Sequence, residues 1–383
     1  MDINSHRRAL LVGCAAFVGL GCTPEVPELG SIDTGCIAQV TSSDGDAVLA
    51  RRSDGTLWRS SGDAGFARVD GADGPLLASD SAASGPNALG LAVGCAVVSQ
   101  HVWCFSLSGA SAAPYEVVTG ADADSPSLTN VTQIAGSTND RGATFCAVTG
   151  DGTLWCWPGT GSSATANNAA RAMLDAATAF SDALEVRVGF DSVCARRTDG
   201  SVWCWGNDDN GQLGTLPSAD HESEEFPVQV ALPAAAIRLA ANASDTTCAI
   251  LEDTSVACWG RNDAGQAGVA SEQRLAPPTL VQTQRTGPSF SAALDLAPDR
   301  AGRAMCANTE NSGLWCWGDV LADDPSGAGS PYPIQLATTP QGRISVPLAA
   351  YGGPNGKLIY VNSNGRLVFG AGSMPSSRQP PCP

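Results

Sequence analysis

The sequence predicts an all-β fold, a seven-bladed β-propeller with four-stranded antiparallel blades. Three observations predict it: a short motif recurs seven times, its copies are spaced by about 52 residues, and every tryptophan lies beside one position of that motif. A four-stranded propeller blade takes about 40 to 50 residues, so the spacing provides one blade for each copy.

The motif is a pair of cysteines separated by a short turn. The clearest copy, CARRTDGSVWCWGNDDNGQLG, begins at Cys194. Four further copies with both cysteines begin at Cys95, Cys146, Cys248 and Cys306, and degenerate copies begin at Val48 and Leu358. The second cysteine or its substitute stands at Arg59, Cys104, Cys156, Cys204, Cys258, Cys316 and Phe369. The first and last of these positions are 310 residues apart, which leaves six intervals of one blade each.

The tryptophans distinguish the two faces of the strand that carries the second cysteine. All nine lie one residue from the aligned position: Trp58, Trp103, Trp155, Trp157, Trp203, Trp205, Trp259, Trp315 and Trp317. Because successive side chains of a strand point to opposite faces, the indoles face away from the cysteines. We expect them to form the core of the repeat, between neighbouring blades.

The spacing of the cysteines predicts the register of each hairpin. In four copies they are ten positions apart, which places them opposite each other across a three-residue turn such as Thr198-Asp199-Gly200. The third turn residue takes a left-handed conformation that suits glycine, and four copies have it: Gly55, Gly152, Gly200 and Gly365. Thr254 and Ser312 replace it in copies five and six, which leaves those turns open to another form. Cys95 and Cys104 are nine apart and fit a two-residue turn at Ser99-Gln100.

Opposed residues of an antiparallel pair have Cα atoms about 4.5 to 5.5 Å apart, a separation that a disulfide can span. The register predicts five cross-strand disulfides: Cys95 with Cys104, Cys146 with Cys156, Cys194 with Cys204, Cys248 with Cys258, and Cys306 with Cys316. The alternative is that these cysteines are reduced and fill the core. Outside the leader two cysteines remain, Cys36 and Cys382, which bracket the propeller. We hypothesise that they also bond and so close the ring.

The N-terminus predicts export and lipid anchoring. Arg7-Arg8 precedes an apolar stretch that is too short for a typical membrane span, and VGLGC ends at Cys22. This resembles the lipobox of bacterial lipoproteins, whose cysteine carries the lipid; the alternative is an ordinary secretory signal. We expect a signal peptide at residues 1–21, a flexible tether at 22–35 and the propeller at 36–383. The predicted location is the cell envelope, at the outer membrane or its periplasmic side.

Charge and composition exclude several classes of function. The net charge of -17 repels nucleic acid, so we expect no nucleic-acid partner. There are three histidines, one of them in the leader, and from the others we cannot assemble a catalytic or metal site. We therefore expect no catalytic residues, no metal and no cofactor.

Two further segments allow local predictions. Four copies contain a proline-led segment that suits the entrance of an outer strand: Pro114 to Val117, Pro227 to Val230, Pro278 to Val281 and Pro333 to Leu336. In the alanine-rich stretch from Ala166 to Leu184, apolar residues recur at helical spacing, which predicts a short helix between blades.

The run from Cys194 to Gly214, and in weaker form from Cys248 to Gly268, resembles the repeat of the regulator-of-chromosome-condensation (RCC1) family. The resemblance covers nearly everything after the tether. It implies a seven-bladed ring closed by strands from both ends of the chain. The nucleotide-exchange and chromatin roles of the eukaryotic namesake do not fit an exported, acidic chain.

Our first functional hypothesis is a non-catalytic exported lipoprotein, a monomer, that presents the propeller as a scaffold for an unidentified protein partner. The long loops of copies four to six would form the binding rim. The alternative is an envelope hydrolase or lyase with a carboxylate-lined site in the propeller funnel. A cluster of inward carboxylates or a bound metal would favour the enzyme.

Overall fold

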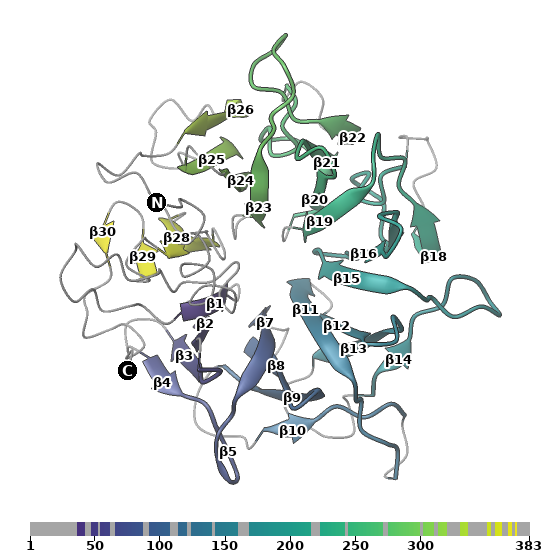
Figure 1. The fold of residues 1–383 in the computed structure, drawn as a ribbon, viewed down its shortest axis with the longest axis vertical. Helices are drawn as coiled ribbons and strands as arrows, with labels where there is room; N and C mark the ends of the chain where they lie inside the picture. Colours follow the sequence, from purple (N-terminus) through teal and green to yellow (C-terminus); the bar gives the residue numbers. More distant parts are fainter. Residues whose placement is uncertain are drawn as a thin grey trace, which may run out of the picture.

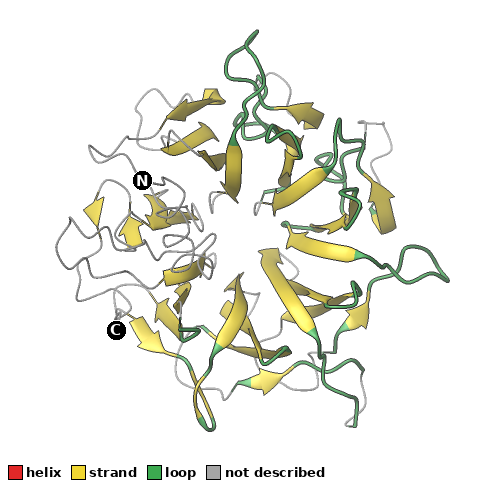
Figure 2. Ribbon diagram, in the orientation of Figure 1, coloured by secondary structure: helices red, strands yellow, loops and turns green. Residues whose placement is uncertain are grey.

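Seven four-stranded antiparallel sheets form a ring of blades around a central axis (Figure 1). The structure is a computed structural model that describes residues 37–42, 47–52, 54–61, 66–86, 92–107, 114–120, 124–139, 142–159, 168–215, 223–241, 244–270, 275–298, 302–309, 313–319, 330–335, 351–353, 357–361, 367–369 and 372–373. Within these residues there are strands and loops and no helix (Figure 2). The predicted all-β propeller is confirmed.

The first three blades occupy residues 37–171. Blade one comprises β1 (Ile37–Ser42), β2 (Ala47–Arg52), β3 (Leu57–Ser61) and β4 (Phe66–Arg68), followed by a small ribbon of β5 (Asp70–Gly71) and β6 (Gly74–Pro75). Blade two comprises β7 (Ala78–Pro86), β8 (Ala92–Val98), β9 (His101–Ser106) and β10 (Tyr115–Glu116). Blade three comprises β11 (Val131–Asn139), β12 (Gly142–Thr149), β13 (Leu154–Gly159) and β14 (Ala170–Arg171).

The remaining blades occupy residues 183–373. Blade four comprises β15 (Ala183–Val188), β16 (Ser192–Arg197), β17 (Val202–Gly206) and β18 (Glu224–Gln229). Blade five comprises β19 (Ala236–Ala241), β20 (Thr246–Leu251), β21 (Val256–Arg261) and β22 (Leu275–Leu280). Blade six comprises β23 (Ala293–Pro298), β24 (Ala304–Thr309), β25 (Gly313–Gly318) and β26 (Ser330–Gln335). Blade seven comprises β27 (Tyr351–Gly353), β28 (Lys357–Val361), β29 (Leu367–Phe369) and β30 (Gly372–Ser373).

Every blade runs outward in chain order, so its first strand lies at the axis, as Figure 1 shows for β1, β7, β11, β15, β19 and β23. The described strands of blade one all come from the N-terminal end of the propeller, and those of blade seven all come from its C-terminal end. No described blade therefore combines strands from both ends, which differs from the closure that the family resemblance implied. The leader, the tether, Cys22, Cys36 and Cys382 lie outside the described residues, and their roles stay predictions.

The structure contains the five cross-strand disulfides that the hairpin register predicts. In each of blades two to six the paired cysteines stand directly opposite each other on the second and third strands. Their Cα atoms are 4.0 to 4.1 Å apart. Leu49 faces Arg59 at the same place in blade one, and Ile359 faces Phe369 in blade seven.

The hairpin turns of blades one to four have the predicted conformations, whereas Ser312 and Gly365 lie outside the described residues. Gly55, Gly152 and Gly200 have positive φ angles of 85°, 78° and 79°. Thr254 takes the same left-handed conformation with φ 65°, so the turn of blade five does not change form. Its Oγ1 accepts a hydrogen bond of 3.0 Å from the Ala292 N–H, which offsets part of the cost of the left-handed backbone. Ser99 and Gln100 both have positive φ, as a two-residue turn requires.

The core lies between blades. One cluster joins Cys194 and Val202 of blade four to Leu239 and Trp259 of blade five, and the clusters of the neighbouring blade pairs repeat this arrangement. The largest fully buried side chains are Trp157, Trp259 and Trp317, which follow the second cysteine in three blades. Tryptophans that precede it, such as Trp155 and Trp203, are half-buried. In blades three, five and six, the indole that follows the second cysteine is thus the one fully buried between blades, as the interblade packing predicts.

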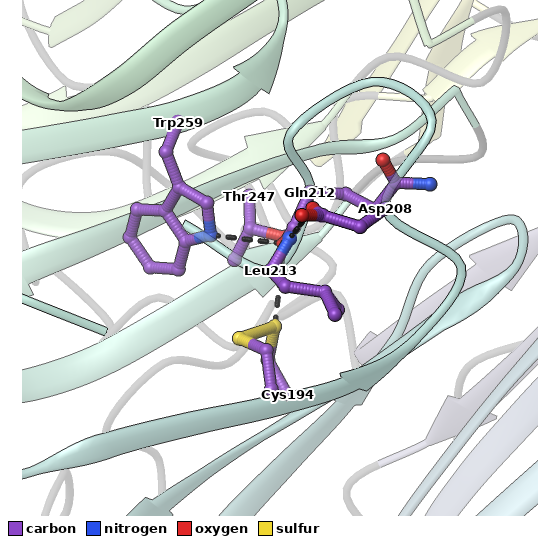
Figure 3. The surroundings of a disulfide bond; sticks show 7 residues. Cys194, Asp208, Gln212, Leu213, Thr247 and Trp259 are labelled. Atoms are coloured by element: carbon purple, nitrogen blue, oxygen red, sulfur yellow. Dashed lines mark hydrogen bonds between the residues drawn. A yellow bond between two sulfur atoms is a disulfide. The ribbon is translucent and has the colours of Figure 1, made fainter. Parts of the chain in front are cut away.

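Two of these indoles are bound by a loop of the preceding blade. Figure 3 shows Trp259 of blade five pointing toward Gln212, whose carbonyl oxygen accepts a 3.1 Å hydrogen bond from the indole Nε1. In the next blade Trp317 Nε1 donates to the carbonyl oxygen of Gln266 at 3.0 Å. Both glutamines are fully buried. The described parts of these loops, residues 207–214 and 262–268, therefore take part in packing between blades.

The segment expected to be helical is irregular. Its described part, residues 168–184, contains β14, an isolated bridge between Met173 and Ala179, and the start of β15. Asp175 Oδ1 accepts hydrogen bonds from the N–H groups of Ala177 and Thr178, which stabilises a turn instead of a helix. Phe180 is buried against Trp205, at a ring-centroid distance of 6.0 Å. The helix prediction was wrong because the apolar residues fill a gap between blades and not one helix face.

We predict that Gly200→Ala lowers the free energy of unfolding by more than Gly211→Ala. Both glycines have left-handed φ angles, 79° and 69°, so alanine adds about 1 kcal/mol of backbone strain at either position. At Gly200 the new Cβ would also lie 2.6 Å from the Ala235 Cβ, whereas it would meet nothing within 4 Å at Gly211. We expect a loss of about 2 to 3 kcal/mol at Gly200, measured by urea unfolding with the disulfides intact. Equal losses would contradict the close packing of this turn on blade five.

We predict that Trp259→Phe destabilises the protein by about 2 to 4 kcal/mol, because it removes buried surface and leaves the Gln212 carbonyl oxygen without its donor. Trp203→Phe is the matched control, since its half-buried indole donates to the Ser201 hydroxyl at the edge of its own blade. We expect the control to lose about 1 kcal/mol. Both values come from chemical denaturation monitored by circular dichroism, and a larger loss for the control would argue against the interblade role of Trp259.

Candidate functional site

The innermost strands of blades one to six share an irregularity at their start. In each, the register with the second strand shifts between the first and third residues, as in Ala183 and Glu185 of β15. Such a bulge inserts one residue and redirects the neighbouring side chains. The third residue is polar in every case. We call these residues the polar ring: Gln39, Asp80, Gln133, Glu185, Arg238 and Asp295.

The polar ring joins each of blades one to five to the blade that follows it. Asp80 Oδ2 accepts a 2.9 Å hydrogen bond from the N–H of Ile134 in blade three. Gln133 Oε1 accepts a 2.9 Å bond from the N–H of Val186 in blade four. Glu185 of blade four and Gln39 of blade one make the same link, at 3.1 Å, to the backbone of Leu239 and Ser81 respectively.

Blade five departs from this pattern because an arginine cannot accept a hydrogen bond. Arg238 lies 3.7 Å from the Asp295 carboxylate in blade six, so an ion pair replaces the acceptor. The N–H of Leu296 then bonds to Asp295 in its own blade, at 3.0 Å. The backbone donor is satisfied in either arrangement, as buried peptide groups require.

The carboxylates of the polar ring are separated and already engaged. Asp80, Glu185 and Asp295 stand in alternate blades, and Glu185 also pairs with Arg187 at 2.8 Å and Arg196 at 3.0 Å. Burial raises the pKa of Asp80 and of Asp295. Among the described residues no three histidine, cysteine, aspartate or glutamate side chains gather as they would around a metal ion. The converging carboxylates that would favour an enzyme are therefore not found in the described part of the funnel.

In blades two to six the inserted residue of the bulge is exposed. In blades four, five and six it is Leu184, Ile237 and Leu294, with exposed fractions of 51%, 48% and 48%. We call these three residues the apolar arc, because they occupy equivalent positions in consecutive blades whose inner strands contact one another. In blades two and three the same position carries Ser79 and Thr132. A set of large apolar side chains left in water on one face is typical of an interaction site.

The apolar arc lies on the face of the ring where the hairpin turns lie. The N–H of Ala183, next to Leu184, donates to the carbonyl oxygen of Gly152 in the turn of blade three, at 2.9 Å. The equivalent bonds join Ala236 to Gly200 at 2.9 Å and Ala293 to Thr254 at 3.2 Å. Each arc residue therefore follows a residue bound to the turn of the preceding blade. We call this side of the ring the hairpin face.

The turns give the hairpin face a negative rim. Asp151, Asp199, Glu252 and Asp253 are exposed at the turns of blades three to five. Asp199 Oδ1 accepts hydrogen bonds from the backbone N–H and hydroxyl of Ser201, at 2.9 and 2.6 Å. Such bonds from a neighbouring serine or threonine lower the pKa of Asp151, Asp199 and Asp253. These three carboxylates thus stay ionised below the pH at which ordinary aspartates become protonated.

Sequence reasoning found the disulfides and the indoles but not the apolar arc. A leucine or isoleucine inside a predicted strand indicates a buried core position. The sequence of the strand does not show that a bulge leaves such a residue exposed. A usable signal is the repeated triplet of alanine, a large aliphatic residue and a charged residue, at Ala183-Leu184-Glu185, Ala236-Ile237-Arg238 and Ala293-Leu294-Asp295. No helix that could span a bilayer occurs in the part of the chain described.

Seven consecutive four-stranded blades, joined by bulged inner strands and by indoles seated in the loops of their neighbours, define a β-propeller repeat protein. Residues 199–250 and 185–212 each match the family described as the Regulator of chromosome condensation (RCC1) repeat. Residues 185–250 therefore contain RCC1-like repeats, and the described chain shares the propeller fold. No curated protein sequence matches it.

Solved structures share the fold at low sequence identity. Prp20p from Saccharomyces cerevisiae, described with its binding properties to Gsp1p and histones, is 16% identical, with a TM-score of 0.58 and 84% of each chain covered. Yeast RCC1 (Prp20) bound to Kap60 is 15% identical, with a TM-score of 0.58, over 85% of this chain and 81% of that one. Human WBSCR16 is 14% identical, with a TM-score of 0.53, over 81% of this chain and 84% of that one.

We predict that the free energy of unfolding of Asp80→Asn, relative to that of the wild type, increases as the pH rises from about 4 to 7. The raised pKa of Asp80 means that the unfolded chain, with an ordinary aspartate pKa of about 3.9, releases this proton at lower pH than the folded chain. The protonated group thus contributes stability below the ordinary pKa, and that contribution is lost as the pH rises through the raised value. Asparagine removes the buried charge and keeps one oxygen to accept from the Ile134 N–H. Its amide NH2 then faces the Ser81 N–H and the Gln39 amide donor, which adds a cost that does not vary with pH. Free energies of unfolding at both pH values measure the effect.

Asp80→Ala is the control for this experiment. It removes the acceptor for the Ile134 N–H at every pH and does not titrate either, so we expect it to be about 1 to 3 kcal/mol less stable than Asp80→Asn throughout the range. An asparagine variant that loses stability relative to the wild type between pH 4 and 7 would contradict the assignment.

Proposed function

We propose that the protein is a non-catalytic, exported lipoprotein that presents its propeller as a protein-binding scaffold at the cell envelope. The observation that carries the binding role is the apolar arc. Three large aliphatic side chains stand about half exposed at equivalent positions on a face held rigid by the polar ring. A rigid frame that presents apolar side chains to solvent suits the binding of a protein, because little conformational entropy is lost on association.

The wider comparison supports a binding role for this fold. Prp20p is described with its binding properties to Gsp1p and histones, and yeast RCC1 is bound to Kap60. Those partners are not transferred to this chain, because identities of 15% to 16% carry the fold alone.

The export and anchoring parts of the proposal have separate support. Five disulfides persist in an oxidising compartment and are rare in a reducing cytosol. The basic and apolar leader that ends at Cys22 supplies the route to that compartment and the site of the lipid.

We predict that a photo-crosslinking amino acid at Ile237 traps a protein partner in intact cells of the native host. The reason is that this side chain is exposed at the middle of the apolar arc. The crosslinker at Leu77 is the matched control, since this leucine is also exposed, at 54%, but belongs to blade two. A discrete adduct at position 237 whose yield saturates, and a weaker one or none at position 77, is the expected result on an immunoblot.

Equal adducts at the two positions, or none at Ile237, would refute the scaffold role. The same strain with Cys22→Ala reports on anchoring. The variant should lose metabolic labelling by an alkyne fatty acid and leave the membrane fraction, whereas unchanged labelling would refute lipidation at Cys22.

A further inference from the structure

The three residues of the apolar arc are alike in kind and in setting. Each is a leucine or isoleucine that follows a buried alanine and precedes a charged residue of the polar ring. The alanine is tied to the turn of the preceding blade and the charged residue is tied to a neighbouring blade, so both neighbours are fixed. The arc residues therefore cannot turn inward without breaking the links between blades. Their exposure is a property of the folded ring.

The charge around the arc is mainly negative. Asp199 lies in the turn bound to Ala236, just before Ile237, and Glu252 and Asp253 lie in the turn bound to Ala293, just before Leu294. All three carboxylates are exposed. Two nearby arginines are paired, Arg197 with Asp182 at 3.0 Å and Arg238 with Asp295 at 3.7 Å, and Arg285 is exposed in the loop between β22 and β23. Three exposed carboxylates against this one arginine leave this part of the hairpin face predominantly negative.

A surface of this kind selects its partner by two properties together. The apolar side chains require aliphatic or aromatic residues to cover them, and the rim requires positive charge. Nucleic acid and an anionic lipid surface provide negative charge instead and are repelled by the rim and by the net charge of -17.

We propose that the hairpin face of blades four to six binds a segment of a partner protein in which apolar side chains are flanked by lysine or arginine. This inference rests on the proposed scaffold function and specifies the chemistry of its partner. The apolar arc would contribute most of the affinity, and the turn carboxylates would contribute orientation and a faster association rate.

The test uses the full mature chain and three fluorescein-labelled peptides. The first alternates leucine with serine over five residues between two pairs of lysines, the second replaces the lysines by glutamates, and the third replaces the leucines by serines. Fluorescence anisotropy at low salt measures the dissociation constants. We expect the lysine peptide to bind at least about tenfold more tightly than either of the others, with a preference over the glutamate peptide that shrinks as salt is added.

Three variants locate the site. Combined Leu184→Ser, Ile237→Ser and Leu294→Ser should abolish measurable binding, and Leu77→Ser should not change it. Combined Asp199→Asn, Glu252→Gln and Asp253→Asn should weaken binding about tenfold at low salt, because each exposed ion pair contributes little by itself. Asparagine keeps the acceptor oxygens that hold the turns. The matched charge control, Glu224→Gln with Glu225→Gln, changes exposed acids of the outer strand β18 and should have no effect.

The outcomes separate this inference from the proposed function. If Ile237 traps a partner in cells but the lysine and glutamate peptides bind equally, or neither binds, the basic partner is refuted and the scaffold stands. If the protein binds phosphatidylglycerol vesicles and the arc variants abolish that binding, a lipid surface replaces the protein partner. If neither crosslinking nor peptide binding occurs, both proposals fail. Unchanged thermal unfolding shows that a variant is folded, and Ile237→Ser alone replaces the triple variant if that one is not.

Discussion

The register of the central hairpin is the constraint on which the rest of the structure depends. A short turn with one or two left-handed residues fixes which side chains oppose each other on the second and third strands of a blade. In blades two to six that choice brings two cysteines together, and it sends the following residue to the opposite face. A shift of one residue would separate the sulfurs and would turn Trp259 away from the loop of blade four. The short turn thus controls both the covalent link within a blade and the packing between blades.

Contacts between neighbouring blades occur at two distances from the axis. Near the axis the polar ring joins adjacent inner strands through side-chain acceptors and backbone donors. Farther out, Trp259 and Trp317 are seated in the loops of the preceding blades. Such a chain of nearest-neighbour contacts is typical of repeat proteins, whose stability is roughly a sum over repeats and the interfaces between them. A frame built in this way can carry the apolar arc in water without collapse of the arc into the core.

Periodic residues made most of the fold predictable, and features without a periodic pattern stayed hidden. Cysteine spacing gave the hairpins, and prolines marked four outer strands, which are present as β10, β18, β22 and β26. The predicted place of the proline was wrong in three of them, because Pro227, Pro278 and Pro333 lie inside their strands and not at the entrance. The bulge at Glu185 and its equivalents could not be read from sequence, because a bulge changes hydrogen-bond pairing and leaves the composition of the strand unchanged. Leu184, Ile237 and Leu294 resembled core residues for the same reason. The alanine-rich segment before β15 had helical spacing, but Phe180 is required against Trp205 and Asp175 stabilises a turn.

The direction of the contacts between blades has a consequence for biosynthesis. The hairpin turn of the earlier blade supplies the carbonyl oxygen for the first residue of the later one, as Gly152 does for Ala183 and Gly200 for Ala236. The polar ring of the earlier blade supplies the acceptors for the N–H groups of Ile134, Val186 and Leu239. The carbonyl oxygens of Gln212 and Gln266 likewise accept hydrogen bonds from the indoles of the following blades. A ribosome makes the earlier blade first. Each new blade can therefore bind to a blade that already exists, and the ring can assemble in chain order before its last blade is made.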